Sequence, residues 1–173
     1  MAFIRVKKIN GYKYAYLVEN VWTNKGPRQK NKKYLGKVYS PRREKSLNFF
    51  DFYKDYDIKV RSKKELIIDY IKLELFNHGF VETKRNVWTK DDYIVNIKTL
   101  NFINNKNKDF AIELNNGALC PYLIKKIIKL KIEPDKEKEE QEGYMLAKLL
   151  VESGLSIDKD IFVRLYELIK AEN

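Results

Sequence analysis

Residues 12–38, YKYAYLVENVWTNKGPRQKNKKYLGKV, decide the fold of the N-terminal part of the chain. Their first half is rich in aromatic and aliphatic residues, and their second half is rich in lysine and arginine. The Gly26-Pro27 pair breaks the segment, because glycine and proline interrupt regular structure. Alternating side chains on either side of this pair are typical of strands. We therefore predict one strand over residues 12–23 and another over about residues 29–39.

A third strand precedes these two. Residues 2–9 are separated from residues 12–23 by Asn10-Gly11, which supplies the positive φ angles of a type I′ turn. The sequence therefore predicts a three-stranded antiparallel meander. Both faces of the strand over residues 12–23 carry apolar side chains, so the pattern leaves open which face meets the core.

The excess positive charge of the protein lies entirely in this N-terminal segment. The whole chain has a net charge of +11, and residues 1–45 contain 13 Lys/Arg against two acids, Glu19 and Glu44. The other 128 residues are electrically balanced. Such a localised positive charge indicates an anionic partner, with nucleic acid as the first expectation and an anionic membrane surface as the second.

Two groups of side chains in this segment are candidates for nucleic-acid contact. The candidates for phosphate contact are Arg5, Lys7, Lys8, Lys13, Lys25, Arg28, Lys30, Lys32, Lys33, Lys37, Arg42 and Arg43. The candidates for stacking on unpaired bases are Tyr12, Tyr14, Tyr16, Trp22 and Tyr34. Edge-strand lysines also prevent aggregation, but that role needs only a few of them. The aromatic side chains have a structural alternative too, which is to pack the sheet against helices.

The pattern Tyr14-x-Tyr16-x-x-Glu19, followed by Arg28-x-x-x-Lys32-Lys33-Tyr34-Leu35-Gly36-Lys37-Val38, resembles the N-terminal segment of some insertion-sequence transposases and small archaeal relatives. In these proteins a strand ending in Tyr-Leu-Gly-(Lys/Arg) follows a basic hairpin near the DNA-binding part. The resemblance covers about residues 12–38 and implies contact with DNA. The rest of the chain departs from a transposase, because it is too short for a full catalytic domain and lacks a convincing spaced trio of metal-binding carboxylates.

The middle of the chain mixes helices and strands. Ser40-Pro41 predicts a helix over residues 40–53, and the capping box Ser62-x-x-Glu65 predicts a second helix that ends before Gly79. The remaining pattern predicts strands over residues 80–89, 93–103 and 109–114, and then a helix over residues 121–130.

The C-terminal part predicts a helical hairpin interrupted at Gly154, with an acidic run over residues 135–142. We expect an α+β protein in three segments: a basic β meander over residues 1–45, a mixed α/β body (α-β-β-β-α) over residues 46–132 and the helical hairpin over residues 133–173. The apolar face of the last helix and the acidic run make a homodimer or a protein partner possible through the C-terminal helices.

Few residues favour an enzyme. His78 and Cys120 are the only histidine and the only cysteine, and no glycine-rich phosphate loop is present. Asp109 and Glu113 resemble part of a metal-dependent nuclease core, but the lysine of its usual Glu-x-Lys signature is absent. We expect no cofactor and no metal. The single cysteine and the lack of any apolar run of membrane-spanning length favour a cytoplasmic protein without membrane contact.

The prediction is therefore a non-enzymatic nucleic-acid-binding protein that contacts phosphates through its basic sheet, with duplex DNA preferred to RNA. Three alternatives stay open. They are an RNA-binding or ribosome-associated factor, a small metal-dependent nuclease that uses Asp109 and Glu113, and a protein-interaction module that uses the acidic run or the C-terminal helices.

Overall fold

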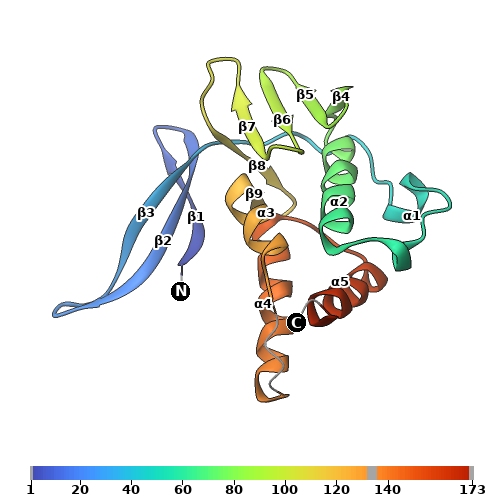
Figure 1. The fold of residues 1–173 in the computed structure, drawn as a ribbon. Coiled ribbons are helices and arrows are strands. Elements are labelled where there is room, and N and C mark those ends of the chain that lie inside the picture. The colour runs from blue at the N-terminus through green and yellow to red at the C-terminus, as the bar shows by residue number, and fades with distance from the viewer. Residues whose placement is uncertain (1, 132–135, 172–173) are drawn as a thin grey trace.

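The computed structural model describes residues 2–131 and 136–171 and has the predicted α+β fold (Figure 1). One sheet has the strand order β1-β2-β3-β8-β9, and the other has the order β4-β5-β6-β7. The strands are β1 (Ala2–Ile9), β2 (Tyr12–Thr23), β3 (Gly26–Tyr39), β4 (Val81–Lys84), β5 (Val87–Lys90), β6 (Tyr93–Asn96), β7 (Asn101–Asn104), β8 (Phe110–Leu114) and β9 (Gly117–Leu119). The helices are α1 (Phe49–Phe52), the 3-10 helix η1 (Ile58–Val60), α2 (Lys63–Asn77), α3 (Pro121–Ile128), α4 (Lys136–Ser153) and α5 (Lys159–Ala171).

The N-terminal meander is confirmed. Asn10 and Gly11 have φ angles of 50° and 83°, as a type I′ turn requires, and β1 pairs antiparallel with β2. The third strand starts earlier than predicted, because Trp22 pairs with Pro27 and Thr23 with Gly26. Proline cannot donate to a sheet, but β3 has no second neighbouring strand at this point, so Pro27 is tolerated there.

The last residues of β3 join the meander to the rest of the protein. Lys37, Val38 and Tyr39 pair in parallel with the first three residues of β8. Gly36 permits this approach, because its φ is +120° and an added Cβ would lie 2.4 Å from the Asp109 carbonyl oxygen. The division of the chain at residues 45 and 132 stays a prediction, and the second boundary falls at residues 132–135, outside the described residues.

The prediction of a helix over residues 40–53 is wrong for its first half. The helix begins only at Phe49, where the Asn48 Oδ1 accepts a hydrogen bond of 2.8 Å from the Asp51 backbone N–H. Residues 40–48 form no helix and instead contact other elements of the protein. The Ser40 hydroxyl donates to the Glu113 carboxylate, and the backbone N–H groups of Glu44 and Lys45 both donate to the carbonyl oxygen of Asn77. These contacts with distant elements replace the bonds of a helical turn.

Two of the predicted middle strands are each a hairpin, and β9 is a further strand that was not predicted, so the region has six strands instead of three. The strand predicted over residues 80–89 turns at Asn86, which has a φ of 65°. The strand predicted over residues 93–103 turns before Leu100, which has a φ of 53°. Asparagine tolerates this left-handed region well, whereas the leucine is unusual there and gives no turn signal in the sequence.

Helix α2 forms as predicted and lies at the centre of the core. Its capping box is complete, and Gly79 has a φ of 78° after its last turn. Helix α5 packs against α2, while α4 packs against α3 and β9. The Tyr39 ring stacks on the Tyr93 ring at a centroid distance of 3.9 Å and so links the two sheets. Within the described part of the chain, no helix is both long and apolar enough to cross a membrane.

Candidate nucleic-acid interface

The far end of the β2–β3 hairpin projects from the body of the protein (Figure 1). Strand β1 pairs with β2 only as far as Glu19, and β8 pairs with β3 only from Lys37 onward. Beyond Glu19 the hairpin is therefore a two-stranded ribbon without a further neighbouring strand. We call residues 19–33 the arm.

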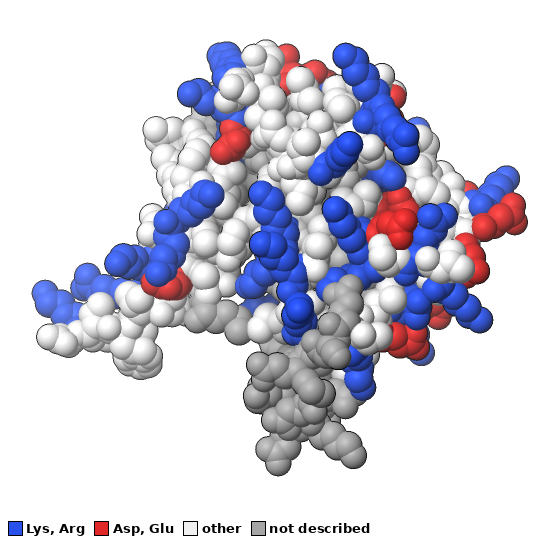
Figure 2. All heavy atoms as spheres, viewed as in Figure 1, with Lys and Arg blue, Asp and Glu red and all other residues white. Residues whose placement is uncertain are grey.

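The arm is strongly basic and exposed. Its cations are Lys25, Arg28, Lys30, Lys32 and Lys33, and its one acid is Glu19. Figure 2 shows a row of lysine and arginine side chains along this projection, at the left of the view. The Lys32 Nζ lies 2.7 Å from a Glu19 carboxylate oxygen. The other four cations form no ion pair with any residue that the structure describes, so their charges face solvent.

The structure also decides which face of β2 meets the core. Ala15 and Leu17 are buried, so their face turns toward the body, and Tyr14 and Tyr16 lie on the opposite face. There the Tyr16 ring packs on the Tyr34 ring at 5.4 Å. Four of the five candidate stacking residues, Tyr12, Tyr14, Tyr16 and Tyr34, thus lie near the base of the hairpin, and Trp22 lies at its tip.

Three further candidate cations share the face of these tyrosines. The Arg5 guanidinium donates to the Gln29 side chain, and the Lys7 Nζ donates to the Asn31 Oδ1 at 3.0 Å. The Lys37 Nζ lies 3.8 Å from the centroid of the Tyr12 ring. Neutral partners hold these cations in place without cancelling their charge. Gln29 and Asn31 were not among the predicted site residues, although they alternate with the cations in the sequence RQKNKK.

Two of the predicted cations bind the body instead of facing solvent. The Lys13 Nζ lies 2.7 Å from both carboxylate oxygens of Glu113. Arg43 donates to Asn115 at 3.0 Å and lies 3.5 Å from the buried Glu74 carboxylate. Burial opposes ionisation of Glu113, but hydrogen bonds from Lys13 and Ser40 hold the pKa of its carboxyl below the ordinary value. Lys8 and Arg42 are exposed and pair with no described acid.

Trp22 is the most exposed large apolar side chain at the tip of the arm. It is 85% exposed. The same four residues, Asn-Val-Trp-Thr, occur at positions 20–23 and 86–89, but Trp88 in the second copy is 4% exposed and belongs to the core. A tryptophan side chain is seldom this exposed, because its large apolar surface is costly to hydrate and its burial against a partner is favourable. The tip therefore combines a large flat apolar ring with the cations Lys25 and Arg28.

Of the four residues considered for catalysis, three are buried or bound to other side chains, and Asp109 is exposed. Glu113 is held by Lys13 and Ser40, and Asp109 lies exposed just before β8. Burial raises the pKa of the Cys120 thiol to about 11. His78 is buried beside Glu74, and burial lowers the pKa of its imidazole. Among the residues that the structure describes, no three histidine, cysteine or acidic side chains form a group that could hold a metal ion.

Comparisons of the chain with protein-family models, with curated proteins and with solved structures found no match. The resemblance of residues 12–38 to transposase N-terminal segments therefore stays a prediction.

Proposed function

We propose that the protein binds nucleic acid through the arm, without catalysis, and that duplex DNA is the preferred ligand. The observation that carries this proposal is the arm itself. It is a two-stranded ribbon that projects from the body and presents four cations that pair with no described acid. Cations displayed in this way release counterions when they meet phosphates, which favours binding.

The shape of the arm favours DNA over duplex RNA. The major groove of B-form DNA is about 12 Å wide and admits a two-stranded β-ribbon, so its walls of phosphate would lie on both sides of the arm. The major groove of A-form RNA is deep and too narrow for this. Trp22 at the tip supports the same proposal, because an exposed aromatic ring can insert at a base step or stack on an unpaired base.

The first experiment is a binding titration of duplex DNA over a series of salt concentrations. We expect the affinity to fall steeply with salt, as a power of the concentration that reflects the number of phosphates neutralised. The triple variant Arg28→Ala, Lys30→Ala, Lys33→Ala should lower that power by about three. Matched titrations with duplex RNA and single-stranded RNA test the preference for DNA.

The control variant removes the same charge from another part of the surface. Lys54, Lys64 and Lys84 are exposed cations of the region between α1 and β4, away from the arm. Changing these three residues to alanine should leave the salt dependence within about one power of the wild type. If both triple variants reduce the salt dependence of binding equally, the affinity depends on the total charge of the protein and not on the arm. A preference for either RNA would replace DNA as the ligand.

We also place the protein in the cytoplasm as part of this proposal, because its cysteine is an unpaired thiol and a reducing compartment suits it. A protein partner or a second copy would use α4, where Tyr144 and Val151 are exposed seven residues apart on one face. Sedimentation of the free protein, at several concentrations, tests whether it associates with itself.

A further inference from the structure

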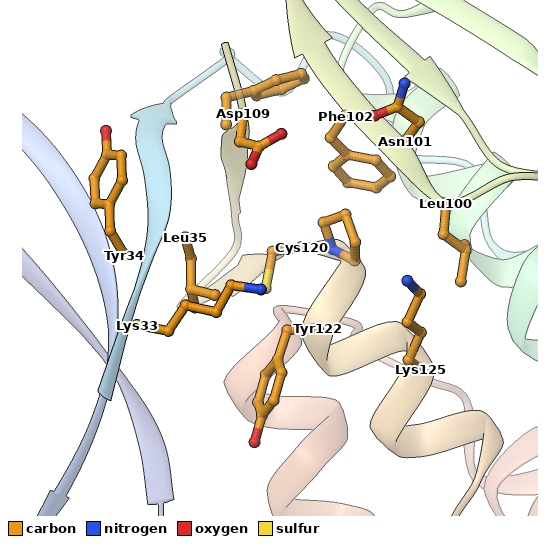
Figure 3. Close-up of a pocket in the computed structure, with 12 residues that line it drawn as sticks. Lys33, Tyr34, Leu35, Leu100, Asn101, Phe102, Asp109, Cys120, Tyr122 and Lys125 are labelled. Atoms are coloured by element: carbon orange, nitrogen blue, oxygen red, sulfur yellow. The ribbon is translucent and has the colours of Figure 1, made fainter. Parts of the chain in front are cut away.

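A pocket of about 220 Å³ lies at the base of the arm, between β3, the start of β8, β7 and the first turn of α3 (Figure 3). We call it the root pocket. The side chains that matter for its chemistry are those of Lys33, Leu100, Asn101, Asp109, Tyr122 and Lys125. Tyr34 contributes too, but its ring points to the other side of β3, where it packs on Tyr16.

Unusual backbone geometry builds this pocket. The pairing of β2 with β3 shifts register between Ala15 and Tyr16, and the extra residue on β3 is Leu35. Gly36 next to it has a φ of +120° and lets β3 approach Asp109. On the opposite wall, Leu100 has a φ of 53°, which is rare for a leucine. Bulges and strained residues of this kind concentrate at functional sites.

The pocket is predominantly positive. Lys33 reaches in from β3 and Lys125 from α3, and Asp109 is the one acid among the lining residues (Figure 3). Both lysines are exposed, and neither pairs with an acid that the structure describes. Cys120 lies in the pocket wall, and its thiol stays neutral at pH 7 because burial raises its pKa. An anionic group fits this arrangement.

The size of the pocket and its position limit the range of ligands that it can bind. Pockets for drug-sized ligands have volumes of roughly 300–1,000 Å³. This pocket is smaller and open, so it suits a small ligand or a single residue of a longer polymer. Lys33 belongs both to the arm and to the pocket, so a chain that follows the arm reaches the pocket directly.

We propose that the root pocket receives one unpaired nucleotide of the nucleic acid that the arm binds. The inference rests on the proposed function. Its phosphate lies between Lys33 and Lys125, and its base lies against Leu100. Asp109 accepts a hydrogen bond from an exocyclic amino group on the base, as acidic side chains do from cytosine N4. Cytosine is therefore preferred to thymine.

The test uses the purified protein and a DNA hairpin with a blunt end and a non-nucleotide linker in place of its loop, compared with the same hairpin extended by three unpaired nucleotides. The extension is CCC or TTT, on the 3′ or the 5′ end. We expect the CCC extension, on at least one end, to tighten binding about tenfold, as stacking of one base typically does. The TTT extension should give a smaller gain, because thymine has no amino group for Asp109.

Two variants with matched controls connect this gain to the pocket. Lys125→Ala should remove most of the gain and leave binding of the blunt hairpin unchanged. Lys129→Ala removes an exposed lysine one turn further along the chain and should keep the gain. Asp109→Asn should reduce the preference for CCC over TTT, whereas Asp92→Asn, in an exposed turn, should not. All four side chains are exposed, so the urea midpoint should not change.

The outcomes separate the two proposals. If the extensions give no gain, or if Lys125→Ala and Lys129→Ala behave alike, the pocket does not bind a nucleotide, and binding of the blunt hairpin still stands for the arm. If the arm variant binds the blunt hairpin as tightly as the wild type, the proposed function fails. If the CCC extension still tightens binding in that case, and Lys125→Ala still removes this gain in affinity, the result supports nucleotide binding by the root pocket alone.

Discussion

In the first half of β3, Arg28, Lys30 and Lys33 are exposed and pair with no described acid. In the second half of the same strand, Leu35 and Val38 are buried, and Gly36 lies against the backbone of Asp109. The first half has one neighbouring strand and the second half has two. One continuous strand thus serves as a surface at one end and as part of the core at the other.

The comparison teaches that a basic sequence does not by itself mark a binding surface. Lys13 and Lys30 belong to the same hairpin, yet Lys13 is bound to Glu113 while Lys30 faces solvent. The number of neighbouring strands makes the difference, because an acid of the body can reach a lysine only where the sheet continues into the body. Four predictions test this contrast.

The first prediction compares two glycines of β3. Gly36→Ala should lower the free energy of unfolding by about 3–5 kcal/mol, because the new Cβ would meet the Asp109 backbone and strain the positive φ. Gly26→Ala at the tip also has a positive φ but no atom within 4 Å, so it should cost only about 1–2 kcal/mol. Urea unfolding measures both values. Equal losses would show that the join between β3 and β8 contributes little to stability.

The second prediction concerns the tip of the arm. Trp22→Ala should weaken nucleic-acid binding by about 1–3 kcal/mol, the usual value of a stacked base, and leave stability within about 0.5 kcal/mol. Tyr144→Ala is the control, because this residue is also an exposed aromatic, 68% exposed, but on α4. Fluorescence titration measures the affinity. Unchanged affinity in the Trp22 variant would limit the interface to the cations.

The third prediction uses pH to separate the body from the arm. Burial lowers the pKa of His78, so the unfolded chain takes up a proton first as the pH falls through its ordinary value of about 6.5. The unfolding free energy should therefore fall by up to about 1.4 kcal/mol for each pH unit between about 6.5 and the folded pKa. Burial raises the pKa of the neighbouring Glu74, which acts in the opposite direction.

His78→Asn isolates the histidine contribution, because the asparagine amide can still donate to the Glu74 carbonyl oxygen that the His78 ring contacts at 2.8 Å. The stability difference between the wild type and this variant should shift as the pH falls from 7 to 5, at the expense of the wild type. A constant difference would contradict the prediction. Binding through the arm should not change over this range, since the arm contains no histidine.

The fourth prediction compares two lysines of the hairpin. Lys13→Gln should lower the free energy of unfolding by about 1 kcal/mol, because it removes the partner of the partly exposed Glu113 carboxylate, and should leave the salt dependence of binding unchanged. Lys30→Gln should leave stability unchanged and lower the salt dependence by about one power. Urea unfolding and the salt titration give both readouts. The reverse pattern would mean that the arm is structural and the base of the hairpin binds the ligand.

Local signals in the sequence predicted much of the fold correctly. The Asn10-Gly11 turn and the Ser62 capping box formed as expected, because each depends on backbone preferences within a few residues. The helix start at Ser40 and the turn before Leu100 were missed for the opposite reason. The Ser40 hydroxyl binds Glu113, 73 residues away, and the φ of Leu100 has no local cause in its residue type.

The candidate site was predictable as a region but not as a set of residues. The β meander and the concentration of charge in the first 45 residues follow from the sequence alone, since both depend on residue type and on neighbours within a few positions. Which cations stay in solvent depends on the tertiary fold, because the acid that neutralises a lysine can lie far away in the sequence, as Glu113 lies 100 positions from Lys13. The same long-range pairing of β3 with β8 created the root pocket, which brings together Lys33, Asp109 and Lys125 from three separate parts of the chain.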